Sequence, residues 1–218
     1  SMALSTEPVR KSFFQDTIAL VYDFDGTLSP QPMQEYTVLP KLGIAPREFW
    51  QRVNEEAAAT ESDTMLVYMR HILEAIEHHR VAVKREDFAR MAKAIKYFPG
   101  VSGWFGRMNA YVRAKSGGRT RLLHYVISAG QKEILDGVSI GRHFRRIYAS
   151  EYHFNHHGVA TFPKRLVTDT VKTQFLFRIN KGKEALTESI NEHMAEADRP
   201  IPFHNMIYVG DGMTDVPS

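Results

Sequence analysis

Hydrophobic residues form short continuous runs at three places along the chain: 17–22, 122–127 and 206–209. Each run contains no turn residues and is followed directly by small or acidic residues. These features predict strands buried on both faces, as in a parallel sheet. Weaker apolar patterns predict two further strands at 146–149 and 171–179.

Between the first two strands the apolar spacing changes to that of helices. Apolar residues recur at intervals of three and four from Met65 to Ile76, and similar faces begin near Pro46 and near Lys84. No strand signal interrupts this stretch, so we expect a small helical bundle there.

The two kinds of pattern divide the chain into two predicted domains. Residues 14–30 and 98–218 are expected to form an α/β core. Residues 31–97 are expected to form a helical cap inserted into it. Within the core, we also predict helices at 101–114 and 184–197.

Composition narrows the class of protein. The 218 residues are 43% hydrophobic, which is ordinary for a globular protein, and the net charge of +3 is too small to imply binding to nucleic acid or membranes. There is no cysteine, which excludes thiolate chemistry and fits a reducing compartment. No apolar run approaches the ~20 residues that span a bilayer. We therefore expect a cytoplasmic protein that binds neither nucleic acid nor membranes. Its oligomeric state is left open.

Acidic residues follow two of the predicted strands at the point where each strand ends. Asp23 and Asp25 come after the first strand, and Asp211 and Asp215 come after the last. In open α/β sheets the ligand site lies at the carboxyl ends of the strands. Burying such acids unpaired costs several kcal/mol each, so we expect a bound cation or a reaction there.

Two other positions could bind an anion at the same edge. Ser128 and Ala129 lie where a strand passes into a predicted helix, and free backbone N–H groups at such a junction suit anions. A plain turn explains them equally well. Lys181 precedes the predicted 184–197 helix.

Clusters of basic residues and histidines have simpler interpretations. His153, His156 and His157 lie at an expected hairpin tip, 153–158, where poor spacing and the lack of cysteine disfavour a zinc site. The Arg and His residues of 142–146 could contact RNA, but a solvated helix end is the favoured interpretation.

Taken together, these residues resemble the four motifs of the haloacid-dehalogenase (HAD) superfamily. Asp23-Phe24-Asp25-Gly26-Thr27 looks like its first motif, Ser128 like the second, Lys181 like the third and Gly210-Asp211-Gly212-Met213-Thr214-Asp215 like the fourth. The helical insertion is similar to the cap of the phosphoserine-phosphatase-like branch. The resemblance implies a Rossmann-like, doubly wound parallel sheet.

The resemblance also implies a Mg²⁺-dependent phosphatase that acts on a small phosphorylated metabolite. Asp23 would attack phosphorus, and Asp25 would protonate the leaving oxygen and later activate water. The metal ligands would be Asp23, the backbone carbonyl of Asp25 and Asp211, supported by Asp215. Ser128, Ala129 and Lys181 would bind the phosphoryl oxygens.

Two departures from the family pattern keep the alternatives open. Pro32 stands where the phosphoserine enzymes carry a substrate-binding Glu, with Glu35 only nearby, so phosphoserine is not implied. Family members continue after the fourth motif with a helix and a strand. Either the natural chain extends beyond Ser218, which we favour, or a neighbouring chain covers the sheet edge. A nucleotidase, a phosphomutase and a non-catalytic phospholigand-binding protein remain alternatives.

Overall fold

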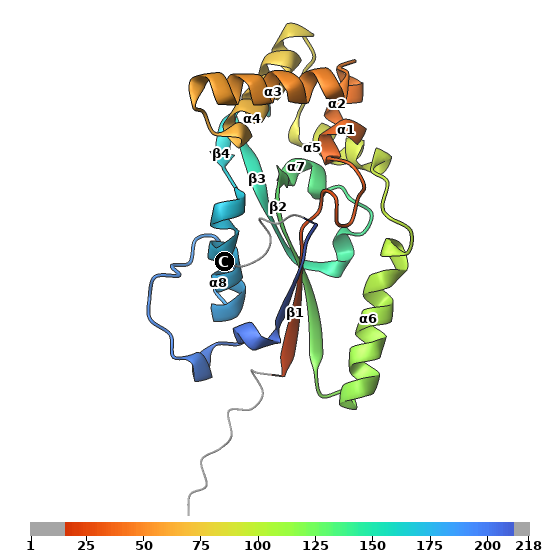
Figure 1. Ribbon diagram of the computed structural model, residues 1–218, viewed down its shortest axis with the longest axis vertical. Helices are drawn as coiled ribbons and strands as arrows, with labels where there is room; N and C mark the ends of the chain where they lie inside the picture. The colour runs from red at the N-terminus through yellow and green to blue at the C-terminus, as the bar shows by residue number, and fades with distance from the viewer. Residues whose placement is uncertain (1–15, 212–218) are drawn as a thin grey trace, which may run out of the picture.

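A five-stranded sheet forms the centre of the computed structural model, which describes residues 16–211. The strand order is β4-β3-β2-β1-β5, and only the β3–β4 pair is antiparallel (Figure 1). The strands are β1 (Thr17–Tyr22), β2 (Arg121–Gln131), β3 (Phe144–Phe154), β4 (Ala160–Arg165) and β5 (Met206–Val209). The predicted strands at 17–22, 122–127, 146–149 and 206–209 are confirmed, and so is the hairpin between β3 and β4.

Eight α-helices lie within the described residues. They are α1 (Met33–Tyr36), α2 (Val38–Lys41), α3 (Pro46–Thr60), α4 (Thr64–His78), α5 (Arg85–Met91), α6 (Val101–Ser116), α7 (Lys132–Leu135) and α8 (Lys172–Lys181). Helices α3, α4 and α5 confirm the helices predicted from the apolar spacing between the first two strands. Helix α6 confirms the helix predicted at 101–114. Within residues 16–211, no helix is both long and apolar enough to cross a bilayer.

Helices cover both faces of the sheet because the side chains of β1 alternate between them. Leu20 and Tyr22 pack on the same face as Phe105 of α6, whereas Val21 packs with Phe175 of α8. Figure 1 shows α6 and α8 on opposite sides of the strands. The doubly wound, Rossmann-like class is therefore confirmed.

Two predictions near the C-terminal end are wrong. Residues 171–179 form most of helix α8 rather than a strand, because Phe175 and Ile179 are buried at helical spacing. The stretch 184–197 is mainly loop, with a 3₁₀ turn at Glu196–Asp198. Buried Arg178 stabilises this loop by donating to the backbone carbonyls of Ala185 and Glu188, and to that of Lys183 just before it.

The predicted cap corresponds to a helical segment, which we define as α1 to α5 with the following 3₁₀ turn (residues 33–94). It shares one continuous hydrophobic cluster with the sheet rather than forming a separate core. The β3–β4 hairpin also packs on it, through contacts of β4 with α4 and a bridge between Lys84 and Val159. The boundaries at 30/31 and 97/98 stay a prediction.

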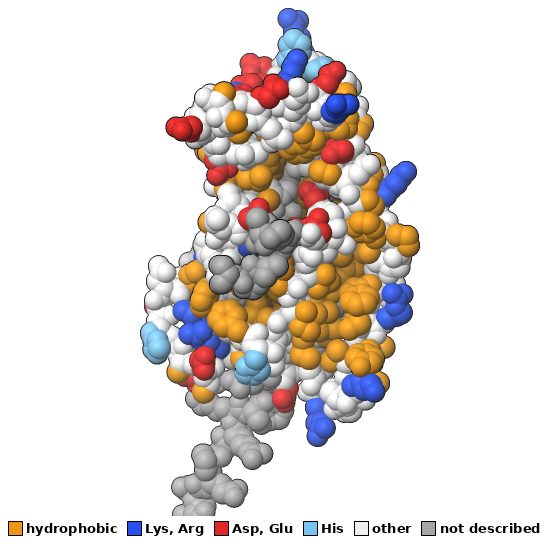
Figure 2. Space-filling model, viewed as in Figure 1, with side chains coloured by type: hydrophobic (Ala, Val, Ile, Leu, Met, Phe, Trp, Pro, Cys, Tyr) orange, Lys and Arg blue, Asp and Glu red, His pale blue; other side chains and the backbone are white. Residues whose placement is uncertain are grey.

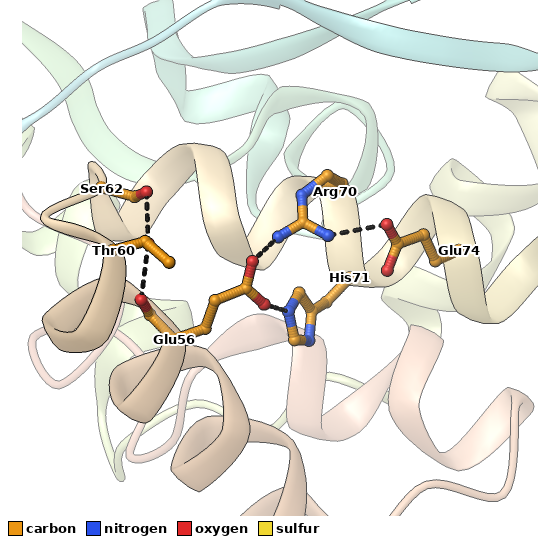
Figure 3. A network of polar contacts seen from close by, with 6 residues as sticks. All are labelled: Glu56, Thr60, Ser62, Arg70, His71 and Glu74. Carbon is orange, nitrogen blue, oxygen red and sulfur yellow. Dashed lines mark hydrogen bonds and ion pairs between the residues drawn. The ribbon is translucent and has the colours of Figure 1, made fainter.

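Charged side chains connect α3 to α4 inside the helical segment. Glu56 of α3 contacts both Arg70 and His71 of α4, and Arg70 also bonds Glu74 at 2.7 Å (Figure 3). Asp63 caps the start of α4 by accepting from the backbone N–H of Met65. The charges in this cluster are paired with opposite charges.

Candidate active site

The end of β1 places Asp23 beside the end of β5. Its backbone N–H donates to the carbonyl of Val209 at 2.9 Å. In its carboxylate, Oδ1 accepts from the N–H of Phe24 at 2.8 Å, while Oδ2 lies 3.6 Å from the ammonium of Lys172. The side chain is 14% exposed, so a small ligand can reach a carboxylate that is otherwise enclosed.

Asp25 follows Asp23 in the same loop, and the acids Asp211 and Glu35 of other segments lie nearby. Its Oδ1 accepts from the backbone N–H of Met33 at 2.9 Å, which ties the loop to α1. Burial raises the pKa of Asp25 to about 7; the Met33 hydrogen bond opposes this rise, and the charges of Asp23, Asp211 and Glu35 reinforce it. A carboxyl group with a pKa near neutrality suits general acid–base chemistry.

Gly26 allows Asp211 to approach this loop. Gly26 has a φ of +78°, and a Cβ built there would lie 2.0 Å from Oδ2 of Asp211. A side chain at position 26 would therefore strain the backbone and displace the acid. The structure thus brings Asp211 to the loop of Asp23 and Asp25, as expected. Asp215 lies outside the described residues.

The donor set at this loop fits a hard cation. Within residues 16–211, no three His, Asp or Glu side chains are grouped as a metal site. The expected set uses only two side chains, those of Asp23 and Asp211, with the backbone carbonyl of Asp25. Carboxylate and carbonyl oxygens completed by water are what Mg²⁺ prefers, and a cation would offset the repulsion that Asp25 experiences from both neighbouring acids. In Figure 2, acidic side chains gather at the waist between the helical segment and the sheet.

The last residues of β2 lie across from Asp25, because the strand continues through Ser128 and Ala129 to Gln131 instead of ending at residue 127 as predicted. Ala129 and Asp25 line one cavity of about 220 Å³. Ser128 is buried, and its hydroxyl accepts from the N–H of Gly130 at 3.0 Å. A Cβ on Gly130 would lie 2.1 Å from the Met33 side chain, so this glycine allows α1 to lie against the end of β2.

Lys181 does not lie at this site. Its ammonium donates to the carbonyls of Ile190 and Glu192, at 2.7 and 3.0 Å. The lysine near Asp23 is Lys172, which is 5% exposed. The two lysines are at opposite ends of α8, about 13 Å apart along its axis. The structure therefore places Lys172, and not the Lys181 that the resemblance implied, beside Asp23.

A helical interpretation of the same residues would have identified Lys172. Lys172, Phe175 and Ile179 are spaced i, i+3 and i+7, so they share the face of α8 that packs on the sheet. A lysine on a buried face needs an anionic partner, and Asp23 and Asp169 lie at 3.6 and 3.4 Å.

The other polar clusters form no second site of this kind. His153 hydrogen-bonds Thr161 at 3.0 Å, and no metal cluster occurs among the residues described. Both Arg145 and Arg146 pair with Glu184. A cavity of about 500 Å³ lies in the helical segment beside His71, but no predicted site residue lines it.

Comparison with known proteins finds a matching protein family and a relative of this chain. A sequence model of the haloacid dehalogenase-like hydrolases matches residues 20–218. An uncharacterized protein of Borreliella burgdorferi is 24% identical over 94% of this chain and 78% of its own length.

Solved structures agree on the fold. A phospho-aspartyl intermediate analogue of phosphoserine phosphatase has a TM-score of 0.59 at 15% identity, over 91% of this chain and 80% of that one. A probable phosphoserine phosphatase from Vibrio cholerae gives the same score and identity, over 91% of this chain and 52% of that one.

Proposed function

The chain belongs to the family of haloacid dehalogenase-like hydrolases, and we propose that it is a phosphatase for a small phosphate monoester. The observation that carries this proposal is the position of Asp23. Its carboxylate is mostly enclosed, has an ammonium at 3.6 Å and lies in the same loop as a second carboxyl group with a pKa of about 7.

The first half of the reaction transfers the phosphoryl group to the protein. A carboxylate oxygen of Asp23 attacks phosphorus, and the bond from phosphorus to the ester oxygen breaks. The leaving oxygen takes the proton of Asp25. Lys172 reduces the repulsion between the anionic nucleophile and the anionic substrate.

The second half returns Asp23 to its starting state. Asp25, now ionised, takes a proton from water, and the oxygen of that water attacks phosphorus. The bond from phosphorus to the Asp23 oxygen breaks, which releases phosphate and restores the carboxylate. Ser128 and the backbone at Ala129 bind the phosphoryl oxygens across the site. Mg²⁺, held by Asp23, Asp211 and the backbone carbonyl of Asp25, would supply charge neutralisation at the transferring group.

The test is hydrolysis of an aryl phosphate in the presence of Mg²⁺. We expect Asp23→Asn to lower kcat by more than about 10³-fold, because the amide is not a nucleophile. Asp136→Asn is the matched control, since Asp136 pairs with Lys132 at the surface, and it should stay within about twofold of wild type.

Equal rates for wild type and Asp23→Asn would refute the proposal. Phosphate binding without turnover by the wild type would instead support the non-catalytic alternative.

A further inference from the structure

The cavity beside Asp25 is where the organic part of a substrate would bind, because Asp25 protonates the oxygen of the leaving group. Its lining includes Gln34 of α1, Trp50 of α3, Tyr68 of α4 and Ala129 of β2. The helical segment thus provides half of the residues that a leaving group would contact. The volume of about 220 Å³ lies below the ~300–1,000 Å³ typical of sites for drug-sized ligands. The group bound there must therefore be small.

One polar atom in this lining has no partner. Gln34 is 2% exposed, and among the described residues its Oε1 has no hydrogen-bond partner. A buried acceptor left unpaired costs about 1–3 kcal/mol, so a donor from a bound molecule would be favourable.

The nearby Tyr68 hydroxyl does not satisfy this oxygen. It donates its only proton to the carbonyl of Ala129 at 3.1 Å. The side-chain oxygen of Gln34 is therefore left as an acceptor that requires a donor.

The remaining lining favours a cation and disfavours an anion. The rings of Trp50 and Tyr68, 5.9 Å apart and at 62° to each other, provide aromatic surface. Behind this lining, Glu35 accepts from the indole N–H of Trp50 at 3.1 Å, so a carboxylate lies next to the aromatic surface. Among the described residues that line the cavity there is no Lys, Arg or His.

We propose that the substrate is the phosphate monoester of a small amino alcohol without a carboxylate, and that Gln34, Trp50 and Tyr68 bind its ammonium group. This inference rests on the proposed phosphatase activity. The ammonium donates to Oε1 of Gln34 and contacts the aromatic rings. A carboxylate on the same substrate would have no cationic partner in the cavity.

Three small phosphate monoesters test the proposal by their kcat/KM values. Phosphoserine differs from phosphoethanolamine by one carboxylate, and propyl phosphate lacks the ammonium. We expect phosphoethanolamine to exceed each of the other two by at least about tenfold. Phosphocholine, whose nitrogen has no N–H, should also be poorer than phosphoethanolamine. A preference for phosphoserine, propyl phosphate or phosphocholine over phosphoethanolamine would overturn the proposal.

A variant pair tests Gln34 itself. Gln34→Met keeps the length of the side chain but removes the acceptor, so the preference for phosphoethanolamine over propyl phosphate should fall about tenfold. Gln34→Glu should keep or increase that preference. Gln51→Met, at an exposed position of α3, is the matched control and should leave the preference unchanged.

The outcomes separate this inference from the proposed function. If hydrolysis of an aryl phosphate depends on Asp23 but kcat/KM is the same for phosphoethanolamine and the other substrates, only the amino-alcohol proposal fails. If no phosphate ester is hydrolysed, the proposed function fails. Should Gln34→Met not fold by circular dichroism, the wild-type substrate ratios still decide.

Discussion

Asp25 and Glu56 are both carboxylates at contacts of the helical segment. Glu56 has basic partners, whereas the charges near Asp25 are all acidic. Glu56 contacts an arginine and a histidine on the neighbouring helix, and its side chain is 33% exposed. Asp25 accepts one backbone hydrogen bond, and the nearby charges that act on it are the three acids Asp23, Asp211 and Glu35.

The difference separates a structural role from a functional one. Paired surface charges such as those of Glu56 contribute little, about 0–1 kcal/mol, and holding α3 against α4 is enough to explain them. An acid whose pKa is raised by burial and like charges lowers the stability of the fold at neutral pH. Such groups concentrate at functional sites. The predictions below use this contrast, from the largest expected effect to the smallest.

Asp25→Asn should give the largest change, and its effects on activity and stability should be opposite. Loss of the general acid should lower kcat by about 10²–10⁴-fold. The folded-state pKa of Asp25 is raised from 3.8 to about 7, so its stabilising contribution is complete below pH 4 and is lost as pH rises through 7. The neutral amide avoids this loss. At pH 8 the variant should gain about 2–4 kcal/mol in its free energy of unfolding, less than the full shift implies where water reaches the carboxylate.

Denaturant unfolding from pH 4 to 8 without divalent cations measures this difference. The gap between variant and wild type should widen as pH rises. If the difference in free energy of unfolding between variant and wild type stays constant with pH, the ionised Asp25 does not destabilise the fold.

The two lysines of α8 provide the next contrast. Lys172→Met should lower kcat/KM for an aryl phosphate by about 10²–10³-fold, because Asp23 loses the ammonium at 3.6 Å. Lys181→Met should stay within about threefold, since its ammonium bonds only loop carbonyls in the described structure. Steady-state kinetics on both variants measures the effect. The reverse order would restore the original assignment of Lys181.

Glu56→Gln should give the smallest effect. Its partners Arg70 and His71 are 45% and 17% exposed, so removing the charge should cost about 0.5–1 kcal/mol in the free energy of unfolding. The kcat for an aryl phosphate should stay within about twofold. Thermal unfolding at low and high salt tests the electrostatic origin, because screening should reduce the difference. A tenfold loss of kcat would mean that this cluster also serves the site.

The sequence was sufficient where one pattern had one interpretation. The run from Thr17 to Tyr22 has no turn signal, and it predicted both β1 and the position of Asp23 and Asp25. It failed for residues 171–179, where apolar residues spaced by four were taken as a strand. The resemblance pointed to Lys181, but helix geometry decides which lysine faces the sheet, and in the structure Lys172 lies beside Asp23.

Other features of the site depend on tertiary contacts. The hydrogen bond from Tyr68 to Ala129 joins residues 61 positions apart, and no local pattern specifies it. The unpaired oxygen of Gln34 is likewise a feature of the packed structure and not of a local pattern. Periodicity predicted helix α4, but it could not predict which of its side chains would reach the end of β2.

Trapping the phosphorylated protein tests the central claim most directly. The enzyme would be mixed with an aryl phosphate and Mg²⁺, quenched in acid, digested and analysed by mass spectrometry. The account predicts one phosphoryl group on the peptide that contains Asp23, and none in Asp23→Asn. Turnover by the wild type with no such adduct, together with an active Asp23→Asn variant, would contradict it.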